Sequence, residues 1–250
     1  MELGIAGRRA AVAGASAGLG LASARALVAE GVAVAICGRD EDRLDQAASQ
    51  LRQGGGRVEA IVADVANPES AAAFVSAARD RLGGLDIVVP NAGGPPAGGA
   101  LDHELAAYRA ALDLNLLSTV AMCAEAVPAL RAQGWGRVVA ITSVSVRQPI
   151  PGLALSSTAR AGATGYLKTL AAEVARDGVT VNSVQPGSHA TDRIAALYGD
   201  LEQAARGVPT GSLGRPDDFG AVVAFLCSDA ARFITGAAIP VDGGAAKGLQ

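Results

Sequence analysis

The chain has 250 residues, half of them hydrophobic but only 3% aromatic, and a formal net charge of −3 at pH 7. This balance offers no basic stripe, which argues against a nucleic-acid partner. No apolar run reaches the length of a membrane span, the N-terminus lacks a signal-peptide layout, and the three cysteines and two histidines form no disulfide or metal pattern. We therefore expect a soluble cytoplasmic protein with no metal and no membrane partner.

Short apolar runs alternate with longer amphipathic ones, which is typical of repeated β-α-β units. The first half predicts strands at 9–13, 32–37, 57–62 and 85–89, with helices at 18–30, from about 40, and at 68–82. The second half predicts strands at 138–141, 179–184 and 238–241, a helix over 155–176 and another beginning near 216. No linker separates two cores. The sequence thus predicts one α/β domain over 1–250, a doubly wound parallel sheet of about seven strands with helices on both faces.

The segment 188–214 lies between the predicted strand 179–184 and the helix that begins near residue 216. Its length and mixed polarity are typical of a mobile lid over a binding site. We favour a lid because sheets of this kind bind ligands at the carboxyl ends of their strands. The alternative is an ordinary surface excursion that contains a short helix over 194–198.

Three glycines, Gly14, Gly18 and Gly20, lie between the first predicted strand and the first predicted helix. The first permits a tight turn, the second a close approach to a pyrophosphate, and the third close packing of helix on strand. The helix N-terminus then offers N–H groups and dipole charge to the phosphates. We predict that this turn binds a nicotinamide dinucleotide, a purely structural turn being the alternative. The other predicted contacts in the turn are Ser16, Ala17 and Leu19.

The end of the second predicted strand bears on which nicotinamide cofactor binds. An acidic residue there accepts hydrogen bonds from the adenosine ribose, whereas an arginine pairs with a 2′-phosphate. The strand ends in Cys37-Gly38 and is followed by Arg39 and then Asp40. Arg39 favours NADP. If Arg39 is only a solvated residue at a helix start, Asp40 serves NAD instead.

Beyond the turn, short motifs follow the predicted strands in order. They are Asp64-Val65, Asn91-Ala92-Gly93, Leu112-Asp113-Leu114-Asn115, Ile141-Thr142-Ser143-Val144, Pro186-Gly187 with Thr191, and Val241-Asp242-Gly243-Gly244. Together with the glycine turn they resemble the short-chain dehydrogenase/reductase family over nearly the whole chain. Within it, the resemblance is closest to the 3-oxoacyl-acyl-carrier-protein reductases.

The resemblance implies a Rossmann fold, a small-molecule carbonyl or alcohol substrate, oxidoreductase activity and a homotetramer. It makes Ser143 the catalytic serine and Asn115 the helix asparagine of the site. Further cofactor contacts are implied around the adenine and the nicotinamide. They are Asp64, Val65, Asn91, Ala92, Gly93, Pro186, Gly187 and Thr191.

The family places a tyrosine and, four residues later, a lysine on the helix that follows the serine. In this chain those positions are Ser156 and Arg160. Tyr166 and Lys168 cannot replace them, because residues two apart do not share a helix face. Ser156 and Arg160 do share one, so Arg160 is expected to donate to ribose hydroxyls. A guanidinium cannot pass a proton onward, and a serine hydroxyl does not titrate near neutral pH.

These substitutions leave the source of a catalytic proton open. Water, Ser156 or His189 are the candidates, although an ordinary loop histidine is the simpler interpretation of His189. The first hypothesis is an NADP-dependent oxidoreductase with an altered proton-transfer pair. The alternative is a catalytically impaired dinucleotide-binding subunit or redox sensor, and a weaker third is a lyase or isomerase.

Overall fold

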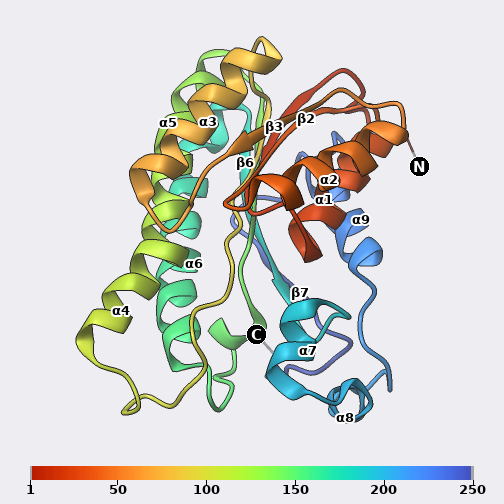
Figure 1. Cartoon of the computed structure of the whole chain (residues 1–250). Helices are drawn as coiled ribbons and strands as arrows, with labels where there is room; N and C mark the ends of the chain where they lie inside the picture. The colour runs from red at the N-terminus through yellow and green to blue at the C-terminus, as the bar shows by residue number, and fades with distance from the viewer. Residues whose placement is uncertain (1, 249–250) are drawn as a thin grey trace.

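The computed structural model describes residues 2–248 and contains a seven-stranded parallel sheet of order β3-β2-β1-β4-β5-β6-β7 (Figure 1). Every predicted strand is present, within a few residues of its expected ends. The bounds are β1 (Arg9–Val12), β2 (Ala33–Gly38), β3 (Val58–Val62), β4 (Ile87–Val89), β5 (Gly136–Ile141), β6 (Val179–Pro186) and β7 (Ala238–Val241). The predicted doubly wound α/β fold is confirmed.

Helices cover both faces of the sheet, as Figure 1 shows. On one face lie α3 (Pro68–Leu82), α4 (Leu105–Leu112), α5 (Ser118–Ala132) and α6 (Ala154–Val174). On the other lie α1 (Gly18–Ala29), α2 (Glu41–Gln53) and α9 (Pro216–Leu226). Two short helices, α7 (Asp192–Tyr198) and α8 (Leu201–Arg206), extend beyond the sheet and belong to the segment 188–214.

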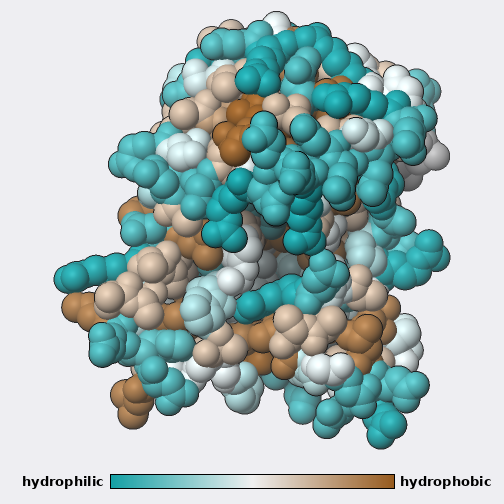
Figure 2. All heavy atoms as spheres, in the orientation of Figure 1, coloured by the Kyte–Doolittle hydropathy of each residue, from teal (hydrophilic) through white to brown (hydrophobic). Residues whose placement is uncertain are grey.

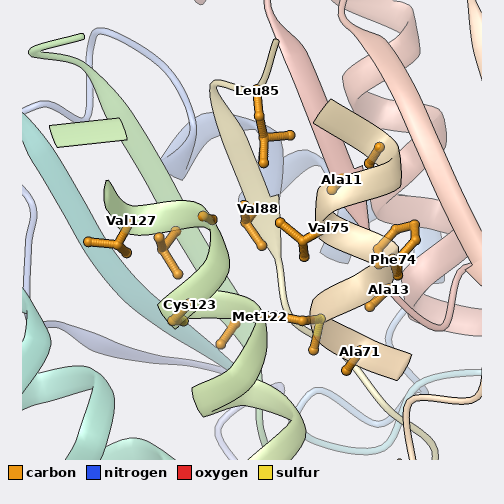
Figure 3. Packing of buried hydrophobic residues seen from close by; sticks show 14 of the residues in the cluster. Ala11, Ala13, Ala71, Phe74, Val75, Leu85, Val88, Met122, Cys123 and Val127 are labelled. Carbon is orange, nitrogen blue, oxygen red and sulfur yellow. The ribbon is translucent and has the colours of Figure 1, made fainter. Parts of the chain in front are cut away.

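Each face of the sheet has its own hydrophobic core. Small and branched side chains of the strands pack against α3 and α5 on one face, where Phe74, Val88 and Met122 are almost completely buried (Figure 3). The opposite core packs Leu27 of α1 and Phe219 of α9 against the strands. Because strands buried on both faces carry apolar residues at nearly every position, the apolar runs of the sequence predict their positions well.

The strand order reverses between β1 and β4, which are direct neighbours in the sheet. Connections on either side of this point run to opposite faces, so the loops that follow the two strands diverge. Such a switch point leaves a crevice at the carboxyl ends of the strands. The glycine turn follows β1, and the 91–93 segment follows β4.

One continuous helix runs over Leu105–Ala132, from α4 through the π-helical turn η1 (Asp113–Leu117) into α5. By length and composition it is apolar enough to cross a membrane, so the expectation that no such run exists was wrong. The sequence reading overlooked the combined length of these helices. Here α5 packs against α3 and the sheet, and η1 packs against α6, as expected for a core helix of a globular fold.

Helices α1 and α9 approach closely because a glycine lies at their contact. A methyl group added at Gly220 of α9 would lie 2.4 Å from the backbone oxygen of Ala22 in α1. The neighbouring backbone cannot move aside without shifting one helix on the sheet.

We predict that Gly220→Ala lowers the free energy of unfolding by about 1–3 kcal/mol, because overpacking a tight backbone contact forces the helices apart. Urea denaturation followed by circular dichroism measures the change. Helix propensity alone predicts the opposite sign, a gain of about 0.5–1 kcal/mol. A stabilised variant would therefore contradict the assigned contact.

Candidate active site

A cleft of about 780 Å³ opens at the carboxyl ends of the strands. Its lining includes the glycine turn, the ends of β4 and β5, the start of α6 and much of the segment 188–214. In Figure 2 the face of the molecule is hollowed above the segment that carries α7 and α8. Most predicted site residues line it: Gly14, Ala17, Gly18, Leu19, Gly20, Asn91, Ala92, Gly93, Ser143, Ser156, Arg160, Pro186, Gly187 and Thr191.

The glycine turn has the backbone geometry that its sequence predicts. Gly14 and Gly18 have φ values of +55° and +57°, a region that favours glycine. A methyl group at Gly20 would lie 2.3 Å from the oxygen of Gly14, so only glycine allows this packing of helix on turn. The Asn91 amide donates to the carbonyls of Ala13 and Gly14, each at 3.1 Å, and so fixes the turn to the end of β4.

The N-terminus of α1 has the donors that an anion requires. No side chain caps it, and its first turn contains no acidic residue. The first backbone N–H groups of a helix have no internal partner and carry the positive end of the dipole. Together with the open cleft beside Gly18, this donor set fits the pyrophosphate of a dinucleotide.

The end of β2 separates the two residues that bear on cofactor choice. The Asp40 carboxylate caps α2, accepting from the backbone N–H of Arg43 at 2.9 Å. Arg39 is exposed, and within residues 2–248 its side chain has no hydrogen bond or ion pair. Ser16 of the glycine turn lies against the end of β2, because a methyl group at Gly38 would lie 3.1 Å from its side chain. Ser16 does not line the cleft.

Two predicted adenine contacts, Asp64 and Val65, do not line the cleft. The Asp64 carboxylate accepts from the backbone N–H of Ala66 at 3.0 Å, and Val65 is part of the core next to α3. Their contact with an adenine stays a prediction.

The side chain of Arg160 joins the ends of two strands. It is 7% exposed, and its guanidinium donates to four backbone carbonyls. Nη1 lies 2.9 Å from the oxygen of Ile141 and 3.2 Å from that of Thr142, both at the end of β5. Nη2 lies 3.1 Å from the oxygen of Ala92 and 3.3 Å from that of Gly93, just beyond β4.

These bonds change what Arg160 can do in the cleft. Burial lowers the pKa of its guanidinium to about 10, and the nearby charge of Arg193 acts in the same direction. The group therefore stays protonated at neutral pH. Because both terminal nitrogens already donate to the backbone, the primary contacts of Arg160 are with the protein, and a bond to a ribose hydroxyl stays a prediction.

Asn115 also bonds to the backbone segment that follows β4. It lies in the π-helical turn η1, is 4% exposed, and its Nδ2 donates to the carbonyl of Gly93 at 3.0 Å. The Gly93 oxygen thus accepts from both Asn115 and Arg160. Asn115 does not itself line the cleft, so the structure makes it a positioning residue for the backbone after β4.

Ser143 and Ser156 present hydroxyls to the cleft from two elements. Ser143 follows β5, and its Oγ accepts from the backbone N–H of Ser145 at 3.1 Å. The hydroxyl hydrogen of Ser143 remains available to donate. Ser156 lies in the first turn of α6, one turn before Arg160, and is 8% exposed. Both residues line the same cleft.

His189 is buried rather than a partly exposed loop residue. It is 3% exposed, its ring packs edge-on against Phe219 at 5.2 Å between centroids, and Nδ1 lies 3.2 Å from the oxygen of Gly187. Burial lowers the pKa of His189 below its usual value, so the ring is neutral at pH 7. Its β-bridge to Gly214 closes the base of the segment 188–214.

The segment 188–214 also makes an ionic contact across the cleft that the sequence analysis missed. Asp192, the first residue of α7, pairs with Arg43 of α2 at 2.8 Å. The two residues are 149 positions apart, so no local pattern signals the pair. The predicted short helix over 194–198 corresponds to the end of α7. Across residues 2–248, no group of three or more His, Cys, Asp or Glu side chains is placed to hold a metal ion.

We predict that Arg160→Met lowers the free energy of unfolding by about 2–3 kcal/mol, because buried carbonyls lose a charged donor. Urea denaturation measures it. Arg160→Lys should lower the free energy of unfolding by less, since an ammonium keeps the charge but cannot bond to both strand ends. Arg176→Met, at an exposed position near the end of the same helix, should stay within about 0.5 kcal/mol of the parent. Equal losses in both methionine variants would contradict the role assigned to Arg160.

Comparison with known proteins agrees with this geometry. The family model described as enoyl-(acyl carrier protein) reductase matches residues 14–246. A 3-oxoacyl-[acyl-carrier-protein] reductase of Synechocystis is 37% identical over 238 residues, covering 94% of this chain and 95% of the relative. A cis-4-hydroxycyclohexanecarboxylate dehydrogenase of Sinomonas cyclohexanicum is 36% identical over 241 residues, covering 95% and 96%.

Among solved structures, L-sorbose reductase from Gluconobacter frateurii, in complex with NADPH and L-sorbose, superposes with a TM-score of 0.94 at 32% identity. The match covers 100% of both chains. The relatives named here are reductases or dehydrogenases, and they match the chain from the glycine turn to the C-terminal motif. The chain belongs to the short-chain dehydrogenase/reductase family, whose members are oxidoreductases of carbonyl and alcohol substrates.

Proposed function

We propose that this protein is an NADP-dependent oxidoreductase that interconverts a carbonyl compound and its alcohol. One observation carries the proposal: a single cleft joins the uncapped N-terminus of α1 to the hydroxyls of Ser143 and Ser156. When bound, a nicotinamide cofactor would supply the hydride, and Ser143 and Ser156 would hold the substrate. In this proposal the segment 188–214 is a lid over the single domain, with its base fixed by the bridge between His189 and Gly214.

The residues that line the cleft fit the pyrophosphate of the cofactor, and Arg39 is exposed outside that lining. The turn 14–20 and the N-terminus of α1 would hold the pyrophosphate, and Arg39 would pair with a 2′-phosphate. Asp40 is less suited to a ribose contact because it already caps α2. Among the solved relatives, L-sorbose reductase was determined with NADPH. The homotetramer implied by the resemblance stays a prediction.

The proposed chemistry depends on a Ser-x-x-x-Arg pair where the family has Tyr-x-x-x-Lys. Ser143 and Ser156 donate hydrogen bonds to the substrate oxygen and so stabilise negative charge that develops on it. Arg160 does not relay the proton, because it stays protonated and donates to the backbone. His189 is buried, and burial lowers its pKa, so little of it carries the extra proton that an acid would donate at neutral pH. We assign the final proton to water that reaches Ser156.

We predict that the protein oxidises NADPH above the buffer rate with at least one member of a panel of ketones, β-keto thioesters and quinones. Ser143→Ala should lower kcat/KM by about 10²–10³, the typical loss for a donor to a developing oxyanion. Ser145→Ala is the matched control, because its buried hydroxyl has no partner within residues 2–248 and does not line the cleft. Absorbance at 340 nm follows the reaction.

Ser156 and Arg160 also favour a second function, that of a dinucleotide-binding subunit or sensor without turnover. Ser156 lacks a titratable proton, and Arg160 lacks a transferable one. If the parent protein shows no turnover but the double variant Ser156→Tyr, Arg160→Lys does, the native chain is a binder. If the double variant abolishes a measurable activity, the native pair is a specialised catalytic site.

We predict that Arg39→Leu raises the Kd of NADPH by about tenfold or more, because a charged contact to the 2′-phosphate is lost. The Kd of NADH should change less than twofold. Isothermal titration calorimetry measures both without any turnover. Asp40→Asn tests the alternative that Asp40 serves NAD. If Asp40→Asn weakens NADH binding and Arg39→Leu leaves NADPH binding unchanged, the cofactor is NAD.

A further inference from the structure

The backbone segment 92–95, which follows β4, is held by two guanidinium groups from opposite sides. Arg160 donates to the oxygens of Ala92 and Gly93 from the buried side. Arg193, from α7 in the segment 188–214, donates through Nη2 to the oxygen of Pro95 at 2.8 Å. Both side chains line the cleft.

Arg193 lies flat on this segment because a glycine leaves room for it. A methyl group at Gly94 would lie 2.8 Å from Cζ, Nε and Nη2 of the guanidinium. Arg193 is nevertheless exposed, and Nη2 to Pro95 is its one hydrogen bond within residues 2–248. A guanidinium has five N–H donors, so an edge of the group remains free toward the cleft.

The charge around this pair of arginines is not balanced by the protein. Among the residues that line the cleft, Asp192 is the one acid, and it pairs with Arg43. Neither Arg160 nor Arg193 forms an ion pair within residues 2–248. The charge of Arg193 also adds to the lowering of the pKa of Arg160. Two uncompensated cations at one segment favour an anion beside them.

The phosphates of a cofactor would have a site of their own at the N-terminus of α1, whose backbone N–H groups are not capped by a side chain. Arg193 instead lies with Arg160 on the segment after β4, and Ser156 is one helical turn from Arg160. Arg193 therefore shares a backbone segment with Arg160, and it lines the same cleft as Ser143 and Ser156, the serines proposed to hold the reacting oxygen. A planar two-donor edge matches a carboxylate.

We infer that Arg193 selects substrates that carry a carboxylate, so that the protein acts on oxocarboxylates and the corresponding hydroxycarboxylates. This inference rests on the proposed function, since it names the substrate class of the same site. Ser143 and Ser156 hold the carbonyl oxygen, and Arg193 binds the carboxylate at the mouth of the cleft. Arg193 is then a specificity-determining residue.

The test measures binding and needs no turnover. Protein saturated with NADP⁺, which cannot reduce a ketone, is titrated in a calorimeter with 2-oxobutanoate, 3-oxobutanoate, 4-oxopentanoate and 4-oxocyclohexanecarboxylate. Each acid is paired with its methyl ester, which keeps the carbonyl and removes the charge. We expect at least one acid to bind about ten- to a hundredfold more tightly than its ester, the range of a charge-assisted bidentate contact.

Arg193→Gln should abolish this preference while leaving the affinity for the ester and for NADP⁺ within twofold. Arg193→Lys should keep part of it, because the charge remains without the planar edge. Arg206→Gln is the matched control: it removes an exposed arginine from the same segment at a position that does not line the cleft, and it should keep the full preference.

Two outcomes would overturn the inference. One is equal binding of every acid and its ester by the parent protein. The other is a weakening of NADP⁺ binding in Arg193→Gln with the acid preference intact, which would assign Arg193 to the cofactor's phosphates. Carboxylate preference without NADPH turnover would support Arg193 as the carboxylate-binding residue and reject the proposed reaction. Turnover of neutral ketones, with equal binding of acids and esters, would support the proposed reaction and reject the carboxylate inference.

Discussion

The buried guanidinium of Arg160 is the contact on which the geometry of the cleft depends. β4 and β5 are neighbours in the sheet, and the segments that follow them both line the cleft. Arg160 bonds to both ends, and Asn115 adds a second donor to one of them. The 92–95 segment and the residues that lead into Ser143 are therefore fixed relative to each other.

This structural use of Arg160 has a chemical consequence. In the family pattern the corresponding lysine serves the reaction, and a phenol beside it exchanges the proton. Here Arg160 donates to backbone carbonyls, and on the proposed function Ser156 takes the place of the phenol. On the proposed function, the site has no tyrosine phenol to act as the acid. Instead, the positive charges of Arg160 and Arg193 lie in the same cleft as two hydroxyl donors. Such charges stabilise a developing alkoxide, so that protonation by water can follow rather than accompany its formation.

The fold and the geometry of the glycine turn were predictable from sequence because both depend on local patterns. Apolar runs identify strands buried on both faces, and the spacing of Gly14, Gly18 and Gly20 identifies the turn. The partners of Arg160 were not predictable, because its i, i+4 relation to Ser156 says nothing about carbonyls 67 and 68 positions away. A helix that carries Asn115 was implied, but its full length over Leu105–Ala132 was not predicted, since an Ala-rich helix has little amphipathic contrast.

Two adjacent residues of α7 reach opposite rims of the cleft. Asp192 pairs with Arg43 at the start of α2, on the side where the adenosine end of a dinucleotide would lie, and Arg193 bonds to Pro95 after β4. On the proposed function, a 2′-phosphate near Arg39 would compete with Asp192 for Arg43, and a carboxylate would bind the edge of Arg193 that Pro95 leaves free. Both ligands therefore act on the same short helix. Because two ligands that bias one element are thermodynamically coupled, cofactor and substrate binding should be linked through α7 rather than independent.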